Sequence, residues 1–337
     1  MLKVFIDRLL TTIPALIGVV VVSFLLTRVL PGDTAAYFAG PAATKEAVEQ
    51  VRQKLGLDKP VPEQFVRYVK DLSAGDLGKS LTTGQPVLAD LKARLPASAE
   101  LTLFGLILSL IIAVPLGIIA AVRQGSWIDH ICRAVATAGV SLPVFFSGLL
   151  LVYVFYFILQ WSPAPLGRLD VFASAPDQVT GFYLLDSLIA LDMETFRASL
   201  AQLILPGVTL AIFALAPIAR ITRASMLAAL SAEFVRTAKA SGLSPRRVIM
   251  TYAFRNAMLP VVTTLGMVFS FLLGANVLVE KVFAWPGVGS YAVEALIASD
   301  FAPVQGFVLT MAILYIVLNL MIDMTYRLID PRIRSGA

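Results

Sequence analysis

Six long stretches of this sequence contain no Asp, Glu, Lys or Arg, and they constrain the fold more than any other feature. A helix rises about 1.5 Å per residue and the hydrocarbon core of a bilayer is about 30 Å thick, so about 20 apolar residues form one span. The sequence contains none of the short alternating apolar and polar segments that mark a membrane β-barrel. It therefore predicts an all-α polytopic membrane protein with six transmembrane helices, the third run holding one span and additional loop. The six runs cover residues 9–27, 101–122, 134–167, 198–219, 256–279 and 301–322.

The distribution of Lys and Arg predicts how the spans are oriented, because short cytoplasmic loops carry an excess of basic residues. With the N-terminus in the cytoplasm, the inside segments hold 14 Lys and Arg, and the two short outside loops hold 3. We therefore expect both termini in the cytoplasm. The net charge of +5 is interpreted as an orientation signal, and no nucleic-acid partner is expected. No small-residue cleavage motif follows the first run, so we expect it to remain as an uncleaved span.

The chain lacks the residues that most catalytic and metal sites require. It contains one cysteine, Cys132, and one histidine, His130, which excludes an intramolecular disulfide, a thiolate metal cluster and any site with two imidazoles. We assign both residues, with Asp129, to a cytoplasmic loop at 123–133. The six runs hold no ionisable group of the kind that ion-coupled carriers place in mid-span. A secondary transporter, a channel or an intramembrane enzyme remains an alternative that these observations disfavour.

The predicted spans divide the chain into three parts. Residues 1–30 form an N-terminal tail and the first span, residues 31–97 an extracytoplasmic segment with short amphipathic helices, and residues 98–337 a five-span core. In the outer segment, Thr44 is a predicted N-cap for a helix at 45–55, and Pro62 is expected to open a second helix. We interpret this segment as a cap on the outer membrane face or against a partner.

Small residues recur at every fourth position of the second run and fall on one helical face. Such a stripe allows another helix to approach closely, so we interpret it as a packing face, with a substrate path as the alternative. Its members are Gly105, Ser109, Ala113, Gly117 and Ala121.

Two groups of polar residues lie at span ends and inside spans. The ionisable residues at span ends are expected to snorkel or to cap, and the uncharged polar residues inside spans are candidates for interhelical hydrogen bonds or cavity lining. The first group is Arg28, Glu280 and Asp323, and the second is Gln202, Asn276 and Asn319.

The largest predicted cytoplasmic feature is the loop at 220–258, which carries seven basic residues and one acidic residue, Glu233. We expect two short helices, the first at about 225–241 with Gly242 as a left-handed C-terminal cap. The second is expected to open with Ser244 as N-cap and Pro245 as its first residue. Composition alone leaves two roles open, a lipid-headgroup anchor and a protein-docking element.

This loop resembles the cytoplasmic EAA loop of ABC-importer permeases. The resemblance rests on the segment from Glu233 to Ile249 and on Arg255-Asn-Ala-Met-Leu-Pro260, with Arg236-Thr237-Ala238 at the Glu-Ala-Ala positions. Further segments are similar to the dipeptide and oligopeptide branch, and residues 180–186 are most similar to the B subunit of dipeptide permeases. These further segments are Leu30-Pro-Gly-Asp33, residues 55–60, residues 75–80, residues 282–289 and Asp330-Pro-Arg-Ile-Arg334.

The resemblance implies a type I ABC importer in the bacterial inner membrane. Its parts would be this chain, a second homologous permease subunit, two cytoplasmic ATPases that bind ATP and magnesium, and an extracytoplasmic substrate-binding protein. The substrate would be a dipeptide or short peptide, with glutathione, a nickel chelate or a sugar as alternatives. The chain itself would hold no cofactor and no catalytic residue. Residues implied in coupling to the ATPases are Glu233, Arg236, Thr237, Ala238, Gly242, Arg246, Leu259 and Pro260.

Overall fold

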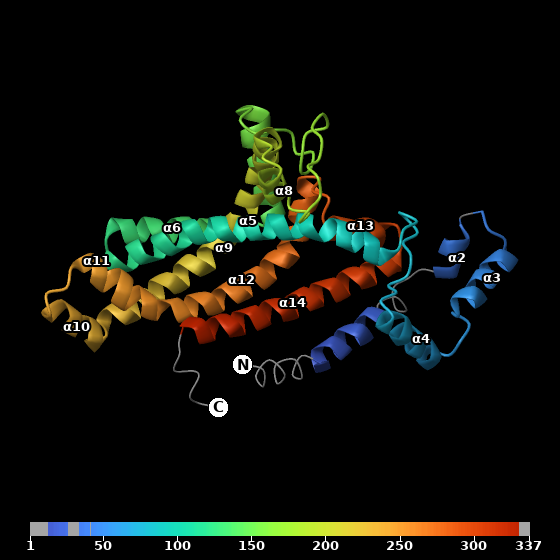
Figure 1. The fold of residues 1–337 in the computed structure, drawn as a ribbon, viewed down its shortest axis with the longest axis horizontal. Helices are drawn as coiled ribbons and strands as arrows, with labels where there is room; N and C mark the ends of the chain where they lie inside the picture. The colour runs from blue at the N-terminus through green and yellow to red at the C-terminus, as the bar shows by residue number, and fades with distance from the viewer. Residues whose placement is uncertain (1–12, 26–33, 41, 330–337) are drawn as a thin grey trace. The chain divides into compact units, whose positions relative to one another are not determined.

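The computed structural model describes residues 13–25, 34–40 and 42–329, and the secondary structure of these residues is helical (Figure 1). The described part contains no strand beyond an isolated antiparallel bridge between Lys79 and Pro86. The motifs at 30–33 and 330–334, together with Arg28, lie outside the described residues, as does the side chain of Asp323. The chain forms two compact units, residues 1–96 with 286–317 and residues 97–285 with 318–337.

The helices follow the predicted runs but extend beyond them. The first unit contains the helix Ile13–Leu25, α2 (Thr34–Ala39), α3 (Lys45–Leu55), α4 (Val61–Ser73) and α13 (Val288–Ile297). Two helices pass from one unit into the other, α5 (Val87–Val122) and α14 (Phe301–Ile329). The second unit contains α6 (Trp127–Val140), α7 (Val144–Leu151), the π-helix η1 (Val152–Ile158), α8 (Tyr183–Ile189), α9 (Met193–Ser231), α10 (Glu233–Ala240), α11 (Pro245–Arg247), the π-helix η2 (Val248–Phe254) and α12 (Arg255–Val282).

Four helical stretches of the described residues are long and apolar enough to cross a membrane: Val87–Val122, Met193–Ser231, Pro245–Val282 and Phe301–Ile322. They match the second, fourth, fifth and sixth predicted runs. The first predicted run is described only over Ile13–Leu25, because its flanks fall outside the described residues.

The third predicted run is not a straight span. Two helical segments, Trp127–Gly139 and Val144–Ile158, meet at an angle of 99°. The break falls at residues 141–143, where Pro143 disfavours a helical conformation for the residue before it. The loop predicted at 123–133 is also wrong, because α6 begins at Trp127 and includes Asp129, His130 and Cys132. The Ser126 hydroxyl caps α6 by accepting a hydrogen bond from the Asp129 N–H group. Only a short turn therefore precedes this helix.

The helices predicted in the outer segment are confirmed. The Thr44 side chain accepts a hydrogen bond from the Ala47 N–H group and caps α3, which ends at Gly56 with φ of +69°. Helix α4 begins at Val61, one residue before Pro62. In the same unit, the rings of Phe65 and Tyr68 on α4 contact Phe24, with centroid separations of 5.2 and 5.7 Å.

A buried carboxylate in the first unit fixes the turn that precedes α5. Asp300 accepts hydrogen bonds from the Ser80 hydroxyl at 2.8 Å and from the backbone N–H groups of Leu81 and Thr82 at 2.7 and 3.1 Å. Ser80 and Asp300 are both almost completely buried. The Gly-Lys-Ser sequence at 78–80 is therefore part of this turn, which its hydrogen bonds to Asp300 hold in place.

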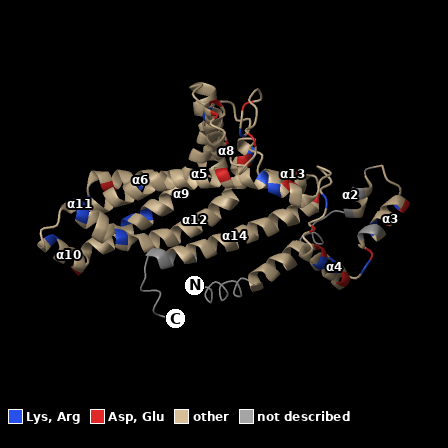
Figure 2. Cartoon of the chain, viewed as in Figure 1, with Lys and Arg blue, Asp and Glu red and all other residues tan. Residues whose placement is uncertain are grey.

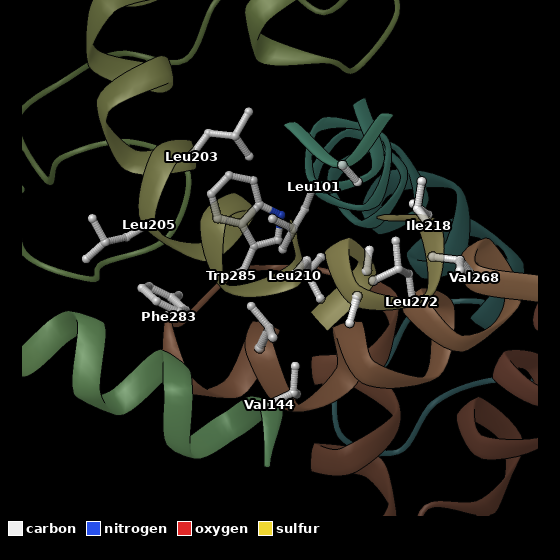
Figure 3. Close-up of a cluster of buried hydrophobic side chains, with 14 of the residues drawn as sticks. Leu101, Val144, Leu203, Leu205, Leu210, Ile218, Val268, Leu272, Phe283 and Trp285 are labelled. Carbon is white, nitrogen blue, oxygen red and sulfur yellow. The ribbon is translucent and has the colours of Figure 1, made fainter. Parts of the chain in front are cut away.

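The core of the second unit is built on α5, α9 and α12. Figure 3 shows the indole ring of Trp285 among Leu101, Leu203 and Leu210. The Trp285 Nε1–H group donates to the Ala97 carbonyl oxygen at 2.9 Å, so the buried ring has no unsatisfied donor. This cluster fixes the end of α12 to α5.

The small-residue stripe of the second run is a packing face, as predicted. A Cβ atom added at Gly105 would lie 2.8 Å from the Leu210 Cβ, and one added at Gly117 would lie 2.6 Å from the Thr222 Cβ. Both contacts are shorter than packed side chains allow, so these glycines let the backbones of α5 and α9 approach.

Glu280 was expected to snorkel or to cap at a span end, and the structure shows that it does not snorkel. Its side chain is buried and accepts hydrogen bonds from the Ser98 hydroxyl at 2.5 Å and from the Asn276 side-chain amide at 3.0 Å. Asn276 also donates to Thr102 Oγ1 at 3.1 Å, which confirms its predicted interhelical bond. The buried Gln202 Nε2 has no hydrogen-bond partner among the described residues.

We predict that Gly117→Val destabilises the protein by about 1–3 kcal/mol, because its side chain overpacks the contact between α5 and α9. The measurement is the thermal unfolding midpoint of the purified protein in detergent. The matched control is Gly274→Val in α12, where an added Cβ meets no atom within 4 Å. Equal shifts in the two variants would show that helix propensity, and not close packing, explains the effect.

Candidate functional site

The predicted coupling loop begins with a break in a long helix. Helix α9 continues past its charge-free run to Ser231, and Ala232 then adopts an extended conformation with φ of −74° and ψ of 151°. Helix α10 follows as a separate element from Glu233 to Ala240. The single helix expected at 225–241 is therefore wrong, and the extended residue sets α10 apart from the axis of α9.

The C-terminus of α10 is capped as predicted. Gly242 has φ of +75°, and its N–H group donates to the Lys239 carbonyl at 3.0 Å. The Leu243 N–H group donates to the Ala238 carbonyl at 3.3 Å, which completes a Schellman motif. An added Cβ at Gly242 would meet no atom within 4 Å, so backbone conformation alone favours glycine here.

The second predicted helix is the start of a much longer one. Ser244 occupies the N-cap position without a side-chain cap bond, and Pro245 is the first helical residue, as expected. The helix does not end in the loop, because α11, η2 and α12 continue without a break from Pro245 to Val282. The expectation of a short second helix is therefore wrong, and the loop joins directly to an apolar helix that is long enough to span a membrane.

Helix α10 has a buried face and an exposed face. Val235 and Ala238 are buried in a cluster with Met226 of α9 and with Val248 and Ala253 of η2. This cluster holds α10 in place through contacts with α9 and with η2. Figure 2 shows that Lys and Arg gather at the end of the unit that carries α10 and α11, whereas α12 is tan over most of its length.

The exposed face carries three of the predicted coupling residues. The side chains of Glu233 and Arg236 are 84% and 73% exposed and form an ion pair at 2.9 Å. Thr237 is exposed beside them, and Phe234 is a large apolar side chain that is 41% exposed. An apolar group among charged groups on a short, fixed helix is suited to contact with a protein partner.

The structure does not bring all the predicted coupling residues together. Arg246 is exposed on α11, next to the Gly242 turn. Leu259 and Pro260 lie inside α12, about four helical turns beyond Pro245. Ala238 is buried and therefore positions α10 instead of forming part of its exposed face.

Sequence reasoning missed an ion pair that joins α6 to α9. Asp129 is almost completely buried, and its carboxylate accepts from Arg223 Nε at 2.8 Å and from Arg223 Nη2 at 2.7 Å. Arg133 Nε lies 3.5 Å from the same carboxylate. Asp129 and Arg223 are 94 positions apart in the sequence, and no periodic signal pairs residues at that separation.

A second missed network holds the segment at 168–192 against α5. The buried Arg168 Nη2 donates to Glu100 Oε2 at 2.6 Å and to the Gly181 carbonyl at 2.7 Å. The guanidinium also lies over the Tyr183 ring, 3.4 Å from its centroid. The Leu184 N–H group donates to the other Glu100 oxygen at 2.9 Å. Glu100 thus anchors the segment that contains residues 180–186.

Asp186 closes the turn in this segment. Burial alone would raise the pKa of the Asp186 carboxyl, but hydrogen bonds from the Thr180 hydroxyl and from the N–H groups of Thr180 and Gly181 outweigh burial and hold that pKa below its ordinary value. Within the described part of the chain, no group of three or more His, Cys, Asp or Glu is arranged to hold a metal ion.

Comparisons with known proteins agree over the whole chain. The profile of the family described as "Binding-protein-dependent transport system inner membrane component" matches residues 113–335, and the profile of its N-terminal region matches residues 1–102. The probable D,D-dipeptide transport system permease protein of Escherichia coli (strain K12) is 46% identical over 95% of this chain and 94% of that protein. The di/tripeptide transport system permease protein of Pseudomonas aeruginosa is 39% identical over 99% of each chain.

Solved structures agree with the fold. Two inward-facing crystal forms of the MetNI methionine ABC transporter are similar to this chain with TM-scores of 0.51 and 0.54. The matches cover 70% and 72% of this chain and 93% and 96% of those chains. At 16% and 14% identity, the likeness concerns the fold alone.

We predict that Asp129→Asn lowers the free energy of unfolding by about 2–3 kcal/mol, because it leaves the partly buried Arg223 without a charged partner. The matched control is Glu233→Gln, which removes the exposed pair with Arg236 and is expected to cost at most about 0.5 kcal/mol. Thermal unfolding in detergent measures both. Similar losses in the two variants would contradict a structural role for the ion pair between α6 and α9.

Proposed function

Because this chain belongs to the family of binding-protein-dependent transport system inner membrane components, we propose that it forms half of the translocation pathway of an ATP-driven importer for dipeptides or short peptides. The chain is a permease subunit of an ABC importer in the inner membrane, and it has no catalytic role of its own. The similarity to peptide permeases over nearly the full length carries the assignment of the substrate class. Glutathione, a nickel chelate or a sugar is the alternative cargo.

The proposed topology has six spans with both termini in the cytoplasm. The excess of Lys and Arg in the inside segments supports this orientation. Four long apolar helices, the bent pair of α6 and α7 with η1, and the helix Ile13–Leu25 supply the six hydrophobic segments. The break at residues 141–143 makes the third of these a bent span.

The proposed complex contains a second homologous permease, two cytoplasmic ATPases and an extracytoplasmic binding protein. ATP and magnesium belong to the ATPases, and the binding protein delivers the peptide. In the proposed topology, the segment at 168–192 belongs to an outside loop, and the ion pair of Glu100 and Arg168 holds it against α5.

Coupling to the ATPases is proposed to run through α10. Phe234, Arg236 and Thr237 on its exposed face would contact an ATPase, while Val235 and Ala238 hold it against α9 and η2. Displacement of α10 would reach the bilayer through the unbroken helix Pro245–Val282, which acts as a lever. The Gly242 turn fixes the angle between α10 and this lever.

The proposed function predicts ATP-driven peptide uptake by the assembled complex. The chain, purified from native membranes in mild detergent, is expected to bring a second permease and two ATPases with it. Vesicles with the reconstituted complex should accumulate labelled dipeptide with ATP and binding protein, and vanadate but not a proton uncoupler should stop accumulation. Recovery of the chain alone, or uptake that follows the proton gradient, would overturn the assignment. ATP-driven uptake of another solute class, without peptide uptake, would overturn only the substrate.

A substitution at Gly242 tests the lever. The side chain of Gly242→Val strains the left-handed conformation by about 1–2 kcal/mol, which lowers the population of correctly oriented α10 by about 5- to 30-fold. We expect normal membrane insertion and a corresponding fall in peptide transported per ATP hydrolysed. The matched control is Gly75→Val, at another left-handed glycine with open space around it, outside the coupling loop. Coupled transport that is normal in Gly242→Val, or equally impaired in both variants, would contradict the lever.

A further inference from the structure

A cavity of about 260 Å³ lies between α5, α6 and α9, away from the exposed face of α10. One part of its lining is basic and comes from Arg133 on α6 and from Arg220 and Arg223 on α9. The other part is apolar and includes Leu116, Ala136 and Ala219. A cavity lined by three arginines and by apolar side chains fits an amphipathic anion.

The charges around the cavity do not balance. Asp129 is the acid that contacts these arginines, and its carboxylate already binds Arg223 through two nitrogen atoms. Arg133 lies farther away, at 3.5 Å. Among the residues that the structure describes, none forms an ion pair with the exposed Arg220. Arg133 Nη2 also lies 2.7 Å from His130 Nδ1, which occupies one of its donors. Three positive charges therefore face one negative charge, and Arg220 and the remaining N–H groups of Arg133 are available to a ligand.

The arginines lie at the ends of charge-free runs. Arg133 immediately precedes the run at 134–167, and Arg220 immediately follows the run at 198–219. The apolar residues of the lining fall inside these runs or inside the run at 101–122. In the topology proposed above, on which this step rests, the basic side of the cavity lies at the cytoplasmic headgroup level and the apolar side at the level of the acyl chains.

We propose that this cavity binds the phosphate group of an anionic phospholipid from the cytoplasmic leaflet. Guanidinium groups bind phosphate oxygens through paired hydrogen bonds, and basic pockets between transmembrane helices on the cytoplasmic side suit anionic headgroups. The start of an acyl chain would lie along the walls formed by Leu116, Ala136 and Ala219. The bound lipid would join α6 to α9 beside the Asp129–Arg223 pair and would stabilise the end of the unit from which α10 extends.

Native mass spectrometry of the purified complex tests the site. The complex in detergent is titrated with phosphatidylglycerol or with phosphatidylcholine, and the bound lipids are counted. We expect preferential binding of phosphatidylglycerol, about fivefold weaker in Arg220→Gln and about 25-fold weaker in Arg133→Gln/Arg220→Gln. The control variant is Arg255→Gln, which removes one exposed charge at the start of α12 outside the cavity and should bind lipid as the natural protein does.

The outcomes separate the sources of the phosphate group. Equal binding of the two lipids, or equal losses in Arg255→Gln and Arg220→Gln, would overturn the site. Displacement of phosphatidylglycerol by millimolar inorganic phosphate would overturn the lipid and indicate a soluble anion. Bound lipids are counted in a measurement that is separate from transport. Loss of the lipid site would therefore not contradict ATP-driven uptake. A failure of ATP-driven uptake would still allow the bound lipids to be counted.

Discussion

A peptide group inside a bilayer has no water to bond with, and this constraint determines where the helices of the chain can break. Three breaks among the described residues illustrate this constraint. Pro143, which has no N–H group to lose, stands at the bend between α6 and α7. Ala232 is extended only after α9 has left its apolar run. The turn at Gly242 satisfies its carbonyl groups through the Schellman motif.

These breaks produce the element that carries the proposed coupling function. Helix α10 is short and would be marginal in isolation, so its stability comes from Val235 and Ala238 packed against α9 and η2. Because the next helix runs without interruption to Val282, a movement of α10 cannot be absorbed by a flexible linker. The division of α10 into a buried and an exposed face therefore separates the residues that hold it from the residues that would contact an ATPase.

The buried carboxylates of the described residues are paired or hydrogen-bonded, and several of these interactions join segments that are distant in sequence. Glu100 binds Arg168, Asp129 binds Arg223, and Glu280 accepts from Ser98 and Asn276. Removal of a buried charge from water is offset only when its partners are held in place. The cavity beside Arg220 differs, because its positive charges exceed the available acid, and this imbalance motivates the proposed lipid site.

The sequence by itself determined the helical class, the N-terminal cap of α3, the C-terminal end of α10 and the packing role of Gly105 and Gly117, because these depend on hydrophobic runs, capping residues and helical periodicity. Through resemblance it also singled out Glu233, Arg236 and Thr237 as candidates for coupling, and these residues are exposed on α10. Only the tertiary structure decided that α9 breaks at Ala232 and that the helix from Pro245 continues to Val282, since local sequence permits a helix or a break at both places. It alone paired Asp129 with Arg223 and buried Glu280, because contacts across long stretches of chain leave no periodic trace in the sequence.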